Sequence, residues 1–276
     1  LDEIYKFSPA ELLCNEAFCM CGADMDELRN RLHISVSTLE NWYFDDELCA
    51  RTLKEHFHVG TLEGLGLKDY ACAVIAAGAL FSYLLETQKT SLEHMRAITP
   101  YITDKYMLID SSTRRNLELT ETMREKGKRG SLLWVLDMTK TAMGARMLRT
   151  FLEQPLIDKD EINGRLDAVE EINRHEMDRE ELREYLNPVY DRERLVSRVS
   201  YQSANPRDMI SFKTSVGMIP HIKKLLEPFT CGELKKVYEE MDDLKDLYAL
   251  LDISIGEAPP LAMKEGGIIK EGYQEQ

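Results

Sequence analysis

The chain has 276 residues, 43% of them hydrophobic, so it can bury a substantial core in one or two domains. Its 35 Lys and Arg residues stand against 49 Asp and Glu residues, which gives a net charge of −14. This charge excludes a protein whose whole surface binds nucleic acid, because neutralising phosphates requires clustered Lys and Arg. It still allows a local basic surface.

Residues 1–88 contain short apolar segments that suit strands mixed with helices. We expect strands over Ala10–Cys14, His33–Thr38 and Trp42–Phe44, and helices over Glu47–Phe57 and from Lys68 to about Glu86. We predict that the helix from Lys68 to about Glu86 is buried and that its small residues allow close packing. Its apolar part is shorter than the roughly 20 residues of a membrane span. We therefore predict a partial α/β domain over 1–88 and no membrane partner.

Strand signals nearly vanish after Gln88 to Thr90, so we predict a second, predominantly α-helical domain over 89–276. Asp158 and Glu161 have capping-box spacing before an apolar stripe at Ile162, Leu166, Val169 and Ile172. Asn205-Pro206 predicts another helix start, and Pro220 predicts a break in the helix that follows.

No pattern in the chain indicates catalysis or a bound cofactor. A phosphate-binding loop needs Gly-x4-Gly-Lys-Ser/Thr, and Gly127-Lys-Arg-Gly-Ser131 has the composition without the spacing, so we interpret it as a turn. The six cysteines lack the spacing of a disulfide framework, and Cys19-Met-Cys21 has no second half for a zinc site. We therefore predict a cytoplasmic protein with reduced thiols and with neither a metal site nor an enzyme active site.

Residues 114–149 carry nine basic residues against four acidic ones, a local balance of +5. Two interpretations stay open. The strip could face DNA phosphates, with candidates Arg124, Lys126, Lys128 and Arg129. Alternatively its arginines form structural ion pairs and bind carbonyls at helix ends, which we favour because bidentate guanidinium groups suit that role.

The order of several motifs resembles the MutS family of DNA mismatch-repair ATPases. They are Arg114-Arg-Asn-Leu-Glu-Leu119, Leu136-Asp-Met-Thr139, Met143-Gly-Ala-Arg-Met-Leu148, Asn205-Pro-Arg-Asp208 and Gly266-Gly-Ile-Ile-Lys-Glu-Gly-Tyr273. Tyr83-Leu-Leu-Glu-Thr-Gln88 resembles the junction of the family's connector and core domains. Ala142 stands where the family often has Pro, which removes only a pre-organised first helical turn.

The resemblance implies an RNase H-like connector that offers a surface to MutL, followed by a helical core that transmits motion. Candidate framework residues are Arg114, Arg115, Asn116, Gly144, where a close helix contact is expected, and Arg146. The chain starts without Met, which predicts a piece of a longer protein. In that longer protein the resemblance implies a mismatch reader before Leu1, levers, a clamp and an ATPase after Gln276, ATP and Mg²⁺ as cofactors, duplex DNA as ligand, and a homodimer.

Overall fold

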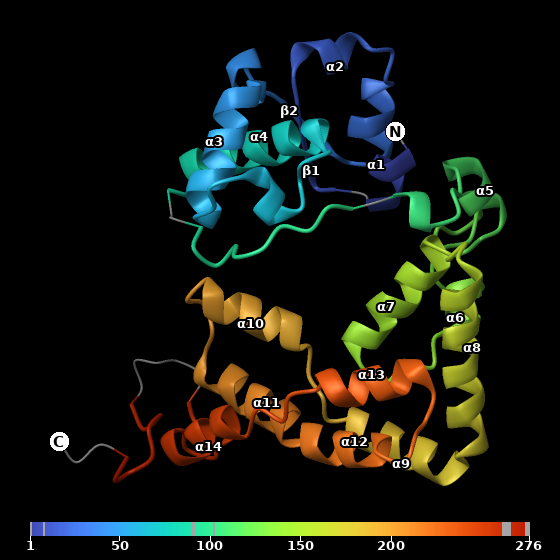
Figure 1. Ribbon diagram of the computed structural model, residues 1–276, viewed down its shortest axis with the longest axis vertical. Coiled ribbons are helices and arrows are strands. Elements are labelled where there is room, and N and C mark those ends of the chain that lie inside the picture. The colour runs from blue at the N-terminus through green and yellow to red at the C-terminus, as the bar shows by residue number, and fades with distance from the viewer. Residues whose placement is uncertain (1, 8, 90–91, 102, 261–265, 274–276) are drawn as a thin grey trace. The chain divides into compact units, whose positions relative to one another are not determined.

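The computed structural model describes residues 2–7, 9–89, 92–101, 103–260 and 266–273, and the chain forms two compact units, 1–104 and 105–276 (Figure 1). The predicted boundary at Gln88 to Thr90 begins where helix α4 (Ala71–Gln88) ends, and Thr90 lies outside the described residues.

The first unit contains a two-stranded parallel sheet with helices around it. Its elements are α1 (Asp2–Phe7), β1 (Glu11–Cys14), α2 (Glu16–Met20), β2 (Ser35–Thr38), α3 (Asp46–Phe57) and α4. Residue 11 pairs with residue 35 and residue 14 with residue 38. Two of the three predicted strands are confirmed as β1 and β2, but Trp42–Phe44 lies in a 3₁₀ helix, Asn41–Phe44, and not in a strand. Three apolar residues beside Asn41 and Asp45 do not distinguish these two conformations.

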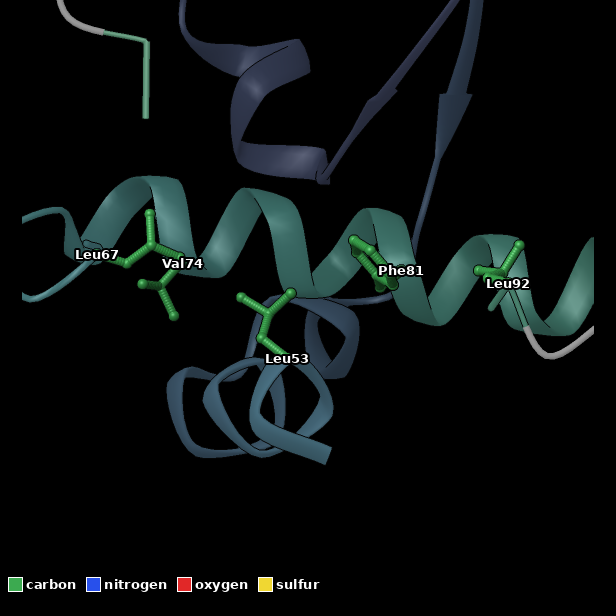
Figure 2. Close-up of a cluster of buried hydrophobic side chains, with 5 residues drawn as sticks. All are labelled: Leu53, Leu67, Val74, Phe81 and Leu92. Atoms are coloured by element: carbon green, nitrogen blue, oxygen red, sulfur yellow. The ribbon is translucent and has the colours of Figure 1, made fainter. Parts of the chain in front are cut away.

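Helices α3 and α4 form the core of this unit. Figure 2 shows Leu53 of α3 beneath Val74 and Phe81 of α4, in one cluster with Leu67 and Leu92. The predicted close approach is confirmed at Gly78, because a Cβ there would lie 2.4 Å from Cys49 Cβ and 2.5 Å from Cys49 Cα.

The prediction of a buried helix holds for only part of α4. It is long and apolar enough to cross a membrane by length and composition alone, and 22% of it is buried in the structure. Leu80 and Leu85 are exposed. Within the described part of this unit, α3 and the 3₁₀ helix make the main contacts with α4, so they cover one side of it.

The second unit is helical, as predicted. Its helices are α5 (Ser111–Asn116), α6 (Leu132–Leu136), α7 (Ala142–Glu153), α8 (Lys159–Arg174), α9 (Glu176–Leu186), α10 (Arg192–Ser200), α11 (Pro206–Gly217), α12 (Ile219–Leu226), α13 (Gly232–Glu240) and α14 (Lys245–Ser254). Ile222, Leu226 and Phe229 form a buried cluster against α8, α9 and α13. Helices α11 and α14 lie side by side (Figure 1).

Several helix starts and ends in this unit lie where local signals in the sequence predict them. Asn205 and Asp208 form a complete capping box at the start of α11. The break predicted at Pro220 is confirmed, because α11 ends at Gly217 and α12 begins with this proline in its first turn. Asp158 caps α8 by accepting from the backbone N–H groups of residues 160 and 161, but among the described contacts Glu161 does not complete the predicted capping box.

The predicted apolar stripe of α8 is mostly exposed. Leu166 and Val169 are exposed by 59% and 64%, whereas Ile172 packs against the cluster around Ile222. The 3.6-residue period therefore marks an apolar face, but within the described residues only its last member is covered.

Candidate functional site

The candidate framework residues Arg114, Arg115 and Asn116 lie on α5. Asp110 caps this helix by accepting a 2.6 Å hydrogen bond from the backbone N–H of Thr113, which lowers the pKa of the Asp110 carboxyl group. Arg115 and Asn116 are exposed. Arg114 is half-buried, and its Nε is a buried donor without a hydrogen-bond partner among the described residues.

The four candidate DNA-facing residues lie in a loop between α5 and α6 whose base is closed by backbone hydrogen bonds. The N–H of Leu132 donates to the Glu118 carbonyl at 3.0 Å, and that of Leu133 donates to the Leu119 carbonyl at 2.8 Å. Leu119 and Leu133 are both buried. The loop is therefore anchored at both ends while its tip is left exposed.

Ser131 fixes the return of this loop into α6. Its hydroxyl donates to the Lys128 carbonyl at 2.7 Å and accepts from the Trp134 N–H at 3.2 Å, and the residue is fully buried. Residues 127–131 thus form a turn ending in a helix cap, as the glycine spacing indicated. No group of three or more His, Cys, Asp or Glu side chains is arranged to hold a metal ion within the described residues.

The four residues expected to face DNA are exposed: Arg124, Lys126, Lys128 and Arg129. They are not equivalent, because Lys128 forms an ion pair with Asp137. That pair, together with hydrogen bonds from Thr139, lowers the pKa of Asp137 to about 2. The other three cations make no ion pair with any residue that the structure describes.

Gly144 lies in the first turn of α7, whose cap is Thr141. A Cβ at Gly144 would lie 3.1 Å from Thr141 Oγ1 and 3.5 Å from Thr139 Cβ. The nearest neighbour of this glycine is therefore the turn that precedes it and not a second helix, which corrects our expectation. The cap itself is intact, since Thr141 Oγ1 accepts from the Gly144 N–H at 3.0 Å. With Ala142 at the first helical position, α7 begins without the proline that is frequent in the family.

Arg146 joins α7 to the start of α10. Its Nη1 and Nη2 donate to the two carboxylate oxygens of Asp191 at 2.6 and 2.9 Å, and Nη2 also pairs with Glu193. Asp191 is the N-cap of α10 and accepts from the Arg194 N–H at 3.3 Å. The adjacent guanidinium lowers the pKa of Asp191, and the carboxylates raise that of Arg146. One carboxylate therefore serves both an ion pair and a helix cap.

A second joint of this kind links α10 to α11. Arg198 Nη1 donates to Asp208 at 2.9 Å, and Arg198 Nη2 donates to the Ser203 carbonyl at 3.2 Å. Asp208 is also the acidic member of the capping box with Asn205. An arginine of one helix again holds a carboxylate that caps the next helix.

The third joint links α8 to α13 through a carboxylate. Glu171 accepts from the backbone N–H groups of Thr230 and Cys231 at 2.8 and 2.9 Å, directly before α13 begins. The Thr230 hydroxyl also donates to Glu171 at 2.8 Å. These hydrogen bonds lower the pKa of Glu171 to about 2. Negative charge at a helix start is also favoured by the helix dipole.

Arg146 is the only member of these joints that the sequence analysis proposed as a framework residue. Asp191 carried a local signal, because an Asp before a helix is a typical cap. Arg198 carried none, and Glu171 is one of two adjacent glutamates that the sequence does not distinguish. Glu171 lies 59 residues from Thr230, so only the folded chain reveals its role.

The chain thus combines a small α/β unit with a helical unit in which three helices are tied at their starts. Comparison with known families agrees with this description. The family model for MutS domain II matches residues 1–96, and the model for MutS domain III matches residues 112–276. The chain therefore belongs to the MutS family, as its motifs suggested.

Similar proteins cover almost the whole chain. The DNA mismatch repair protein MutS of Lachnoclostridium phytofermentans is 62% identical over 99% of this chain, which corresponds to 29% of that protein. The proteins of the same name from Acetivibrio thermocellus and Ruminiclostridium cellulolyticum are 45% and 46% identical over 100% and 99% of this chain, in each case 31% of the relative. The chain thus spans somewhat less than a third of these relatives.

Proposed function

We propose that this chain is the connector and core of a DNA mismatch-repair protein and that it transmits motion between parts that read DNA and parts that hydrolyse ATP. The observation that carries the proposal is the set of joints at Asp191, Asp208 and Glu171, each placed at a helix start. Membership of the MutS family supports the repair context.

The geometry of the joints suits rigid-body transmission. A bidentate guanidinium–carboxylate pair fixes orientation as well as distance, so a displacement of α7 acts on the first turn of α10. Arg198 then connects α10 to the first turn of α11. Packed helices with discrete arrangements can carry coupling between distant sites.

We infer the cofactors and partners of a longer protein from membership of the family. The glycines at 127 and 130 lack the phosphate-loop spacing, so we do not assign ATP or Mg²⁺ to this loop. We assign nucleotide chemistry, mismatch reading and the main homodimer contact to other parts of a cytoplasmic protein. The first unit would supply the surface for MutL.

A chimaera tests the transmission role. This chain replaces the matching segment of the Lachnoclostridium phytofermentans relative, and Arg146→Met is compared with Arg149→Met. Arg149 is the matched control because it pairs with Glu153 on its own helix. We expect Arg146→Met to retain mismatch binding and basal ATP hydrolysis but to weaken the dependence of hydrolysis on mismatched DNA. Equal dependence in the two variants would contradict the proposal.

The isolated chain gives a second test of the same proposal. We expect no ATP hydrolysis and no preference for a mismatched over a matched duplex in a gel-shift titration. Mismatch-selective binding by these 276 residues alone would contradict our assignment of mismatch reading to other parts of the protein.

A second function, direct contact of the loop with duplex DNA, is favoured by the exposure of Arg124, Lys126 and Arg129 without ion-pair partners in the described structure. Lys126→Gln/Arg129→Gln is compared with Lys235→Gln/Lys236→Gln, an equal change of charge at exposed positions of α13. If the loop binds phosphates, the loop variant alone lowers duplex affinity and flattens its salt dependence. Absence of duplex affinity at low salt would eliminate this function.

A further inference from the structure

Two cysteines of the first unit lie together although they belong to different elements. Cys14 is the last residue of β1, and Cys19 is on α2, with four residues between them. Their sulfur atoms are 3.9 Å apart. The other four cysteines are Cys21, which is exposed at the end of α2, and Cys49, Cys72 and Cys231, which lie on other elements.

We propose that Cys14 and Cys19 form a dithiol site that a low-molecular-weight disulfide converts into an intramolecular disulfide bond. This proposal is independent of the function proposed above. A sulfur–sulfur bond is about 2.05 Å long, so the two sulfurs must approach by about 2 Å.

The surroundings of the pair allow this approach. Helix α2 is five residues long, has no buried residue, and is held at its start by Asn15, which accepts from the Phe18 N–H at 3.0 Å. Cys14 is fixed in the sheet, where it pairs with Thr38 of β2 and is only 5% exposed. The Cys19 sulfur must therefore make most of this movement, because its side chain lies on a short and lightly packed helical turn.

Exposure also sets the order of the two chemical steps. The thiolate is the reactive form of cysteine, and burial raises the pKa of the Cys14 thiol. Cys19 is less buried, so it meets a dissolved disulfide first. Its thiolate attacks one sulfur of glutathione disulfide, forms a mixed disulfide, and releases one glutathione thiolate.

Cys14 completes the reaction. Its thiol loses a proton to solvent, and the resulting thiolate attacks the Cys19 sulfur and displaces the second glutathione. The two protein thiols are thereby oxidised by two electrons, and one glutathione disulfide is reduced to two glutathione molecules. The product ties the end of β1 to α2.

Mass spectrometry of the reduced 276-residue chain, incubated with glutathione disulfide without denaturant, tests the site. We expect the intact mass to fall by two hydrogen atoms, with a crosslink between the peptides that contain Cys14 and Cys19. The loss should persist in Cys21→Ser and disappear in Cys19→Ser. In Cys14→Ser a glutathione adduct should remain on Cys19, because no thiol is left to resolve it.

The result with the wild-type chain alone can overturn the proposal, so the test does not depend on whether a variant folds. A stable glutathione adduct on Cys19 of the wild-type chain, or a Cys19–Cys21 crosslink, would show that Cys14 is not the partner. An unchanged mass under these conditions would show that no reactive dithiol exists at this position.

Discussion

Arg146 of α7 binds Asp191, the residue that caps α10, through hydrogen bonds of 2.6 and 2.9 Å to its two carboxylate oxygens. The same carboxylate accepts from the Arg194 N–H. Removing the arginine therefore leaves the cap in place but frees its orientation. The side chain of Arg146 is 47% exposed, so solvent screens the pair and its geometric role outweighs its contribution to stability.

Arg146→Lys should separate charge from geometry. Lysine keeps the positive charge but cannot make the two parallel hydrogen bonds of a guanidinium group. We expect a small decrease in the urea midpoint of unfolding, and faster amide hydrogen exchange in the first turn of α10. Exchange in α10 identical to that of the unsubstituted chain would show that Arg146 does not position this helix.

Local sequence signals predicted helix starts well in the second unit. Asp158 and Asn205 carry their own hydrogen-bonding groups within a few residues of the N–H groups that they satisfy. Pro220 similarly acts on its own helix. These features depend on short stretches of chain, so periodicity and capping rules were sufficient to find them.

Several features that depend on tertiary contacts were not predicted. Glu171 has the same local sequence signal as its neighbour Glu170, yet only Glu171 reaches Thr230. Cys14 and Cys19 lack metal-ligand spacing, and their sulfurs meet only because a strand end and a helical turn converge. Gly144 was assigned a helix contact from its residue type, whereas the fold places Thr139 and Thr141 there.

Gly78→Ala should destabilise the first unit strongly. The added Cβ would lie 2.5 Å from Cys49 Cα, a backbone atom, so α3 and α4 must move apart. Overpacking of this kind costs about 1–3 kcal/mol or more. Urea unfolding measures the loss, and Gly60→Ala is the control because nothing lies within 4 Å of its Cβ position. Equal stability of the two variants would contradict the close approach of the helices.

Ser131→Ala should loosen the base of the basic loop. The substitution leaves the Lys128 carbonyl and the Trp134 N–H without their hydroxyl partner at a fully buried position. Loss of a serine cap of this kind costs about 1–2 kcal/mol. Limited trypsin digestion should then cleave faster after Lys126, Lys128 and Arg129. Ser112→Ala, at an exposed position of α5, should leave the cleavage rate unchanged, and equal acceleration in both would refute the anchoring role of Ser131.

Glu171 should contribute to the acid sensitivity of the second unit. Hydrogen bonds from Thr230 and Cys231 lower its pKa from 4.5 to about 2 in the folded chain. A carboxyl group whose pKa is lower in the folded state stabilises that state above the unfolded pKa, and this stabilisation is lost as the pH falls from about 4.5 to about 2. We therefore expect Glu171→Gln to lower the thermal midpoint at pH 6 and to reduce its dependence on pH below 4.5.

The neighbouring residue supplies the control for this measurement. Glu170 pairs with Arg174 on the exposed side of the same helix, so Glu170→Gln removes the same charge one position away. Thermal unfolding of both variants between pH 2 and pH 6, followed by circular dichroism, should show a flattened acid limb only in Glu171→Gln. If both variants keep the full pH dependence of the unsubstituted chain, the carboxylate of Glu171 does not hold the start of α13, and α8 and α13 are joined by apolar packing alone.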